Sequence, residues 1–179
     1  MQAENRSLKE QVQKLEVRSN QTEEDLNDLE QYGRRECLEF QGLASKENTD
    51  DLVGVCKLLN VDLDRRDISV SHRLAPATES NQQPAIITRF CSGKVRDSIF
   101  SQRHRLHSYN RSHPKARMFI NESLTKSNQR RFNQCLRYRK EKSCKYIWTK
   151  QRNIFVRQTE GSPVIAIKTE SDFAKYDIN

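Results

Sequence analysis

The first 32 residues follow a heptad pattern, in which apolar or tolerated positions are spaced alternately by four and three residues. No Gly or Pro interrupts this segment before Gly33. The pattern predicts a coiled-coil helix over residues 1–33, whose narrow stripe suits partner helices better than a globular core. A single amphipathic helix packed on its own domain is the alternative. We expect oligomerisation through six seam positions, which are Leu8, Val12, Leu15, Thr22, Leu26 and Leu29.

The number of chains in the coil is open between two and three. Ser19 and Thr22 weaken the seam, so it should set register and oligomer state more than it adds stability. Arg18 and Glu23 have a charge spacing associated with trimeric coils, although polar residues occupy the apolar slots between them. We therefore favour a homotrimer over a dimer.

Strand and helix signals alternate in the next part of the chain. The expected segments are strands at 36–43, 67–74, 85–90 and 116–121, and helices at 50–61 and 93–103. In the second strand, Ile68, Val70 and His72 alternate with polar residues, as inward positions of a half-buried strand do. The order β-α-β-β-α-β predicts a split βαβ domain over residues 34–121, with a four-stranded antiparallel sheet and both helices on one face.

A third region begins near Leu124, with Thr125 as the expected N-cap of a helix that runs to about Lys142. Short apolar strands follow at 145–149, 153–157 and 164–168, and a last short helix begins near residue 170. This pattern predicts a small C-terminal α-β-β-β-α domain over residues 122–179. The chain as a whole is therefore expected to be an α+β protein.

The net charge of +8 is distributed unevenly. Residues 1–32 hold four cations and eight acids, whereas residues 103–152 hold 15 cations and two acids. Between Leu124 and Arg157 the cations are interspersed with Phe, Tyr and Trp. Cations neutralise phosphates and flat rings stack on any base, so the combination predicts nucleic-acid binding without sequence readout.

Other function classes find no support in the sequence. The five cysteines are scattered and contain no C-x-x-C pair, which indicates reduced core residues and neither a disulfide framework nor a zinc site. His104, His107 and His113 match no ligand spacing. Since no phosphate loop, nucleophile elbow or paired-carboxylate motif occurs, we expect no enzyme, no cofactor and no small-molecule substrate. No apolar run approaches the roughly 18 residues of a membrane helix, so we expect an intracellular, soluble protein.

Several short motifs resemble a known family in their order and spacing. They are "YGRRECLEFQGL", "ISVSHRL", "PAIITRF", "FINESLT", and "YIWTKQRNIFVR" with "SPVIAIKTESDF". Together with the coil and the basic helix, they resemble the first-open-reading-frame protein of LINE-type non-LTR retrotransposons. The last part is also similar to the C-terminal domain of the baculoviral FP (few-polyhedra) protein.

The resemblance implies a coiled-coil homotrimer whose protomers carry an RRM-like (RNA-recognition-motif-like) domain and a basic C-terminal domain. Such a protein binds single-stranded RNA and acts as a nucleic-acid chaperone.

The resemblance also implies contact residues after the coil, on the RRM-like domain, on the basic helix and on the following strands. The matching positions are Arg34, Arg35, Arg73, Arg89, Arg130, Arg131, and Tyr146 or Trp148. The cationic block adds Arg103, Arg105, Arg117, Arg137, Tyr138, Lys142, Lys150 and Arg152. The strand "AIITRF" places Arg89 and Phe90 on opposite faces, so on that sheet we expect contact with the nucleic-acid backbone and not base stacking.

Structural roles compete with these contacts. Arg34 and Arg35 at the coil exit also suit the negative end of the helix dipole. Glu39 is a candidate ion-pair partner for Arg73 or Arg89, and Tyr146 and Trp148 share a strand face that is a candidate core face.

We expect an oligomeric, sequence-tolerant binder and chaperone of single-stranded RNA, or of single-stranded DNA, in a retrotransposon-like ribonucleoprotein. The expected location is cytoplasmic ribonucleoprotein particles, with a nuclear location left open. The alternative is a structural or interaction protein resembling baculoviral FP, in which the coil is the working part and the basic surface meets an acidic protein or an anionic membrane. A duplex-DNA binder is a third reading.

Overall fold

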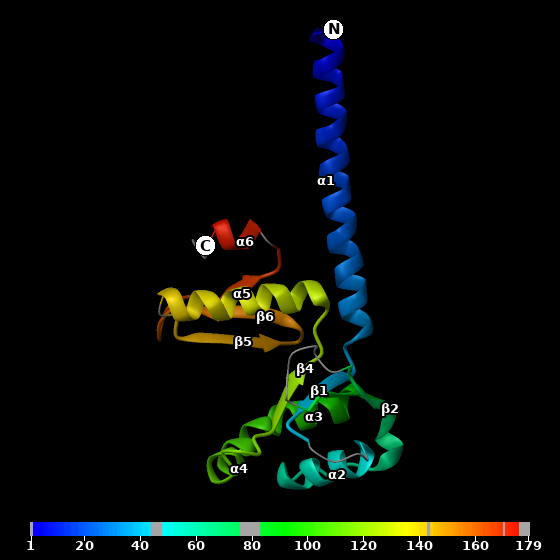
Figure 1. Ribbon diagram of the computed structural model, residues 1–179, viewed down its shortest axis with the longest axis vertical. Coiled ribbons are helices and arrows are strands. Elements are labelled where there is room, and N and C mark those ends of the chain that lie inside the picture. The colour runs from blue at the N-terminus through cyan, green and yellow to red at the C-terminus, as the bar shows by residue number, and fades with distance from the viewer. Residues whose placement is uncertain (1, 44–47, 76–82, 143, 170, 176–179) are drawn as a thin grey trace. The chain divides into compact units, whose positions relative to one another are not determined.

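Figure 1 shows a computed structural model that describes residues 2–43, 48–75, 83–142, 144–169 and 171–175. Contacts divide the chain into two compact units. One unit is Arg34–Ser123, and the other joins residues 1–33 to residues 124–179. The mixed helix and sheet architecture is confirmed, with a long N-terminal helix and two antiparallel sheets.

The unit Arg34–Ser123 contains a four-stranded antiparallel sheet with the strand order β2-β3-β1-β4. Its strands and longer helices are β1 (Cys37–Gln41), α2 (Asn48–Leu58), β2 (Ile68–Arg73), β3 (Ile86–Phe90), α3 (Gly93–Gln102) and β4 (Phe119–Glu122). The sequence pattern did not predict its short helical segments, which are η1 (Arg65–Asp67), η2 (Arg103–Arg105) and α4 (Leu106–Ser112).

One face of this sheet carries the hydrophobic core. The core cluster includes Leu38, Phe40, Ile86, Phe90 and Ile120 from the strands, Leu52, Val55, Cys56 and Leu59 from α2, and Ile99 from α3. Because both helices bury their apolar side chains against the same strand residues, they cover the same face. The opposite face is left to the alternate strand residues, such as Glu39 and Arg89.

The alternation expected for β2 is wrong beyond Ile68. A β-bulge between Ile68 and Val70 shifts the register, so that Val70 pairs with Arg89 and Arg73 pairs with Ile86. Ile86 is buried and Arg89 is exposed, and cross-strand partners share a face of the sheet. Val70 therefore lies on the open face, where it is 49% exposed, and Arg73 lies on the core side. One inserted residue reverses the facing of every later residue in the strand.

Gly42 ends β1 in a conformation that only glycine adopts easily. Its φ angle is +85°, and a Cβ atom there would lie 1.9 Å from the carbonyl oxygen of Arg117. The close approach of these two backbone segments therefore requires a residue without a side chain.

A buried ion pair connects α3 to β4. Arg96 Nη2 lies 2.5 Å from Glu122 Oε1, and the two side chains are 6% and 0% exposed. Arg96 Nη1 also lies 2.8 Å from Oδ1 of the exposed Asp97. Since both buried charges are removed from water, each needs the other for compensation.

The second unit contains a three-stranded antiparallel sheet with the order β5-β6-β7. Its elements are α1 (Gln2–Gly33), α5 (Lys126–Lys142), β5 (Tyr146–Lys150), β6 (Asn153–Arg157), β7 (Ile165–Ile167) and α6 (Ser171–Lys175). The core cluster joins Cys135 and Tyr138 of α5 to Ile154 and Val156 of β6 and to Phe173 of α6. The helix α5 therefore covers one face of this sheet (Figure 1).

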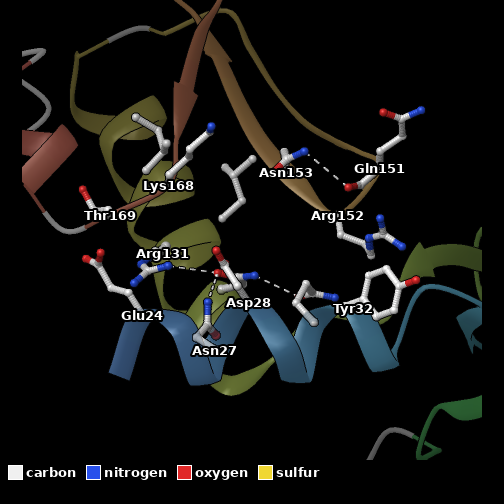
Figure 2. Close-up of a pocket in the computed structure, with 14 residues that line it drawn as sticks. Glu24, Asn27, Asp28, Tyr32, Arg131, Gln151, Arg152, Asn153, Lys168 and Thr169 are labelled. Carbon is white, nitrogen blue, oxygen red and sulfur yellow. Dashed lines mark hydrogen bonds between the residues drawn. The ribbon is translucent and has the colours of Figure 1, made fainter. Parts of the chain in front are cut away.

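Thr125 caps α5, as the sequence predicts. Its Oγ1 accepts a hydrogen bond from the Asn128 N–H at 3.1 Å. The same hydroxyl donates to Asn27 Oδ1 of α1 at 2.6 Å, and the Thr125 N–H donates to Gln31 Oε1 at 3.0 Å. Asn128 Nδ2 also donates to Gln31 Oε1 at 2.9 Å. Hydrogen bonds thus hold the start of α5 on the C-terminal part of α1. Figure 2 shows the adjoining pocket, where Asn27 of α1 lies near Arg131 of α5.

The helix α1 makes these contacts with its outer side. Counted from the d position Leu8, Asn27 falls at heptad position b and Gln31 at position f. The seam residues Leu26 and Leu29 are 64% and 69% exposed. The helix therefore packs on its own domain through polar outer positions, and its apolar stripe stays uncovered in the single chain.

Candidate nucleic-acid interface

The sheet β5-β6-β7 has one face that is rich in aromatic rings. Ile147, Ile154 and Val156 belong to the core cluster or pack against it, on the side of α5. Successive side chains of a strand alternate between the two faces. Trp148 and Phe155, which are cross-strand partners, therefore point away from α5.

Tyr146, Trp148 and Phe155 form a surface that we call the aromatic face. The rings of Trp148 and Phe155 stack with centroids 5.7 Å apart and an interplanar angle of 20°. Trp148 is half-buried and Tyr146 is 37% exposed. Phe155 lies opposite the small Ala166 of β7, which adds little bulk beside the ring. The core lies on the other side of the sheet, so these rings offer flat apolar area to a ligand.

Cations accompany the rings on the same face. Lys150 pairs with Asn153 and Arg157 pairs with Tyr146, which places both cations on the aromatic face. Arg157 Nε donates to the carbonyl oxygen of Ser162 at 2.9 Å, which fixes its guanidinium. None of the residues that the described strands place on this face is acidic. The face therefore combines positive charge with stacking area.

Lys145 stands beside the first ring of this face. Its Nζ lies 5.1 Å from the Tyr146 ring centroid and 2.9 Å from Glu160 Oε2. The hydrogen bond with Tyr146, followed by that with Glu160, raises the pKa of Lys145. The charge of Lys145 is therefore already paired with the carboxylate of Glu160.

A strained turn connects β5 to β6. Lys150 pairs with Asn153, which leaves Gln151 and Arg152 as a two-residue loop with φ angles of 50° and 67°. Positive φ at both central residues is typical of type I′ turns, where Asn and Gly are preferred. Arg152 lines a cavity of about 390 Å³ together with the acidic Asp28 of α1 (Figure 2). The cation at this turn therefore lies at a mixed-charge site and at the margin of the aromatic face.

Two predicted contact residues of α5 are buried. Arg131 is 6% exposed, and its Nη1 donates to Asn128 Oδ1 at 3.1 Å. Tyr138 is 6% exposed and belongs to the core cluster, and its hydroxyl accepts a hydrogen bond from Gln158 Nε2 at 3.3 Å. Both side chains stabilise the unit, and we leave them out of the proposed interface.

Two other cations of α5 are exposed. Arg130 and Arg137 lie on the outer side of the helix, and the side chain of Lys142 lies outside the described residues. Because α5 covers the opposite face of the sheet, these cations and the aromatic face belong to opposite sides of a two-layer structure. Among the described residues, the exposed Arg130 and Arg137 therefore lie on the other side of this unit from the cations of the aromatic face.

At the coil exit, Arg34 is tied to the sheet of its own unit. Arg34 Nη1 donates to Ser123 Oγ at 3.2 Å, and Ser123 Oγ donates to Glu39 Oε1 at 3.0 Å. Burial raises the pKa of Glu39, while the bond from Ser123 and the charge of Arg34 act in the opposite direction. Arg35 is exposed, 3.6 Å from the carboxylate of Glu36. Glu39 therefore has Arg34 as a charge partner, whereas the sequence offered Arg73 or Arg89 as candidate partners.

The remaining predicted arginines of this unit lie in different environments. Arg89 is exposed on the open face, whereas Arg73 donates from Nη1 to the Pro84 carbonyl at 3.0 Å on the core side. Arg117 is exposed. The sheet thus brings only one of its two predicted strand arginines to the open face.

Arg103 and Arg105 follow α3. The guanidinium of Arg103 lies 3.8 Å from the ring centroid of Phe100, and Nη1 donates to the Phe100 carbonyl at 2.7 Å. Burial lowers the pKa of Arg103. Arg105 is exposed and donates from Nε to Gln102 Oε1 at 2.8 Å.

Sequence analysis missed Phe155 and Arg157. Both could have been found from the sequence, because a two-residue turn at Gln151 and Arg152 determines which residues of the two strands lie opposite each other. That register places Phe155 opposite Trp148.

The part of the chain that the structure describes contains neither a membrane-spanning helix nor a cluster of metal-binding side chains. None of its helices combines the length and the apolar character that a membrane crossing requires. In the same residues, no group of three His, Cys, Asp or Glu side chains is placed to hold a metal ion.

Comparison with known proteins found a similarity in the C-terminal part of the chain. Residues 125–177 match the family described as Baculovirus FP protein domain 2. This match confirms the FP-like part of the resemblance, and the LINE-type part stays a prediction. Comparison with curated proteins found no match.

Proposed function

We propose that the protein binds single-stranded RNA with little sequence preference, through the aromatic face and its cations. The observation that carries the proposal is the row of Tyr146, Trp148 and Phe155 on the uncovered side of the sheet, with Lys150 and Arg157 beside it. A base stacked on such a ring contributes roughly 1–3 kcal/mol whatever its identity. Each phosphate neutralised on a single strand contributes a salt dependence of about −0.7 in log K per log salt.

The unit Arg34–Ser123 supplies a second binding surface in this proposal. Its element order and its strand order β2-β3-β1-β4 support an RRM-like domain with an open sheet face. Arg89 is exposed on that face. Backbone phosphates are the ligands we assign to it.

Self-association through α1 is part of the proposed mechanism. The exposed seam of Leu8, Leu15, Leu26 and Leu29 suits partner copies of the same helix. A homotrimer would link three modest sites, and linkage raises avidity by a factor of order 10²–10⁴ when one strand reaches all sites. Fast local release with slow global release would let strands rearrange while bound, which is the action of a nucleic-acid chaperone. We place this activity in a retrotransposon-like ribonucleoprotein, in cytoplasmic particles or in the nucleus.

The second candidate is a structural or interaction protein similar to baculoviral FP. The family match at residues 125–177 and the uncovered seam of α1 favour it. In this reading the coil is the working part, and the basic surfaces meet an acidic partner.

The test is a titration of the full chain with labelled mixed-sequence 20-nucleotide RNA at several salt concentrations, with the oligomer mass measured by light scattering. Trp148→Leu removes the ring and keeps apolar volume, so we expect affinity to fall at least fivefold, while Trp148→Phe keeps most of it. Lys150→Ala should reduce the salt slope by about 0.7, whereas Lys9→Ala on α1 is the charge-matched control and should not.

Two outcomes would contradict the proposal. One is weak, salt-insensitive binding by the unaltered chain, which favours the interaction protein. The other is equal affinity for Trp148→Leu and Trp148→Phe. Tighter binding to a duplex of the same sequence would favour the duplex-DNA reading.

A further inference from the structure

The unit Arg34–Ser123 contains a cavity of about 490 Å³ at the outer edge of β4. The cavity is formed by η2, α4 and β4, and β4 is an edge strand of the sheet. Its walls include Phe119, Asn121, Arg103, His104 and His107. None of the described residues that line it is acidic. The cavity therefore suits a ligand that carries negative charge.

The cavity is held open by a two-point hydrogen bond. Asn110 Nδ2 donates to the Met118 carbonyl at 2.8 Å, and the Met118 N–H donates to Asn110 Oδ1 at 2.8 Å. The side chain of Asn110 thereby fixes α4 to the chain just before β4. A cavity that exists before the ligand arrives requires little ordering on binding.

Phe119 lines this cavity with a flat ring. Its side chain is 48% exposed although it lies in the sheet. Phe119 pairs with Gln41 and Asn121 pairs with Glu39 of β1, so both residues lie on the open face. On β3 the open face receives Arg89 and the ring of Phe90 is buried, so β4 supplies the ring on that face.

Hydrogen-bonding groups lie next to the ring. In an antiparallel edge strand, every second residue directs its N–H and C=O away from the sheet. Met118 directs both groups toward Asn110, so Ile120, two residues on, directs its own groups the same way, toward the cavity that it lines. Asn121 lines the cavity as well. A donor and an acceptor beside a flat ring match the edge and the face of a nucleobase.

We propose that this cavity binds one nucleobase and its phosphate from the single-stranded RNA, with the base stacked on Phe119 and the phosphate facing Arg103, His104 and His107. The proposal rests on the proposed function, and it adds a base-binding position to a sheet otherwise assigned to backbone contact. An extended peptide that adds a strand to β4 is the competing occupant. The absence of acids among the lining residues and the exposed ring favour the nucleobase.

Three variants of the full chain test the proposal with the same labelled 20-nucleotide RNA. Phe119→Leu keeps the apolar volume and removes the ring, so affinity should fall about 5- to 150-fold, the range of one lost stacking contact. Phe119→Tyr keeps the ring and should bind within twofold of the unaltered chain. Val70→Ala is the matched control, because Val70 is equally exposed on the same face, on the other edge strand. It should also bind within twofold.

Amide hydrogen exchange provides a second readout. RNA should slow exchange across residues 118–122, and a capped Thr-Val hexapeptide should not. If Phe119→Leu binds RNA like Val70→Ala, or if only the peptide protects this segment, the cavity is not a base site. Loss of affinity in Trp148→Leu alone would overturn the cavity and keep the proposed function. Absence of RNA binding by the unaltered chain would overturn both.

Discussion

Replacing Glu122 by Gln removes one charge from the buried ion pair and keeps the shape of the side chain. The partner Arg96 is only 6% exposed, so it cannot recover hydration in place. Removing one member of a buried pair costs about 3–5 kcal/mol. Arg96 retains Asp97, which is 72% exposed and therefore well screened by water. We expect a loss at the lower end, about 3 kcal/mol, from a domain stability that is typically about 5–15 kcal/mol.

The assay is urea and thermal unfolding followed by two probes. Far-UV circular dichroism reports both units, whereas fluorescence reports Trp148, the single Trp of the chain, in the other unit. A loss of 3 kcal/mol lowers the melting temperature of a unit of this size by about 12–24 °C. We therefore expect an early transition in circular dichroism and a smaller change in the fluorescence midpoint.

Two further variants separate the ion pair from its surroundings. Asp97→Asn removes the exposed partner and should cost less than about 1 kcal/mol. Replacing Arg96 and Glu122 together by Leu removes both buried charges and should cost much less than Glu122→Gln. If Glu122→Gln unfolds at the same urea concentration as Asp97→Asn, the buried pair does not stabilise α3 on β4 and the reasoning fails.

Three other predictions concern the coil, a turn and acid stability. Leu15→Lys combined with Leu26→Lys should convert the proposed oligomer to a monomer in light scattering, while Gln13→Lys at an outer heptad position should not; a double variant with the same mass as the unaltered chain would refute the proposed seam. Gly42→Ala should lower the melting temperature by several degrees because its Cβ would meet the Arg117 carbonyl, whereas Gly54→Ala in α2, with nothing within 4 Å, should not lower it. Hydrogen bonds from Arg66 lower the pKa of Asp64 from 3.8 to about 2, so this carboxylate stabilises the fold fully above pH 3.8 and loses that effect as pH falls toward 2. Asp64→Asn should therefore lose less stability than the unaltered chain over this interval, measured by thermal unfolding in a pH series.

The sequence predicted elements where the apolar period was regular. The heptads of α1 and the apolar runs of β5, β6 and β7 correspond to elements of the structure, with ends shifted by a few residues. The segment from His104 to Ser112 has no clear apolar period, and the short helix α4 was missed there. A regular spacing of apolar residues predicts a helix or a strand because the residues that recur at that spacing lie on the same buried face.

The side of a strand or helix on which an individual side chain lies depended on features that the spacing of apolar residues does not encode. A single bulge in β2 moved Arg73 to the core side, opposite Ile86. Arg131 is the second member of an Arg pair, yet the helix turn and the docking of α1 bury it against Asn128. Both outcomes depend on contacts between segments far apart in the sequence. Local sequence patterns therefore predicted that the unit would be basic better than they predicted which individual arginines would be exposed.

The polar junction between α1 and α5 has a consequence for assembly. Its hydrogen bonds join neutral groups, and each bond contributes roughly 0.5–1.5 kcal/mol net to stability. The junction therefore fixes geometry more than it adds stability. It occupies heptad positions b and f of α1, at Asn27 and Gln31, and leaves Leu26 and Leu29 uncovered. It also involves the start of α5, whereas the aromatic face lies on the other side of the sheet from that helix. Within this unit, the attachment of α5 to α1, the proposed association between coils and the proposed stacking of bases would thus use three different surfaces, and none of them would have to be released for another to act.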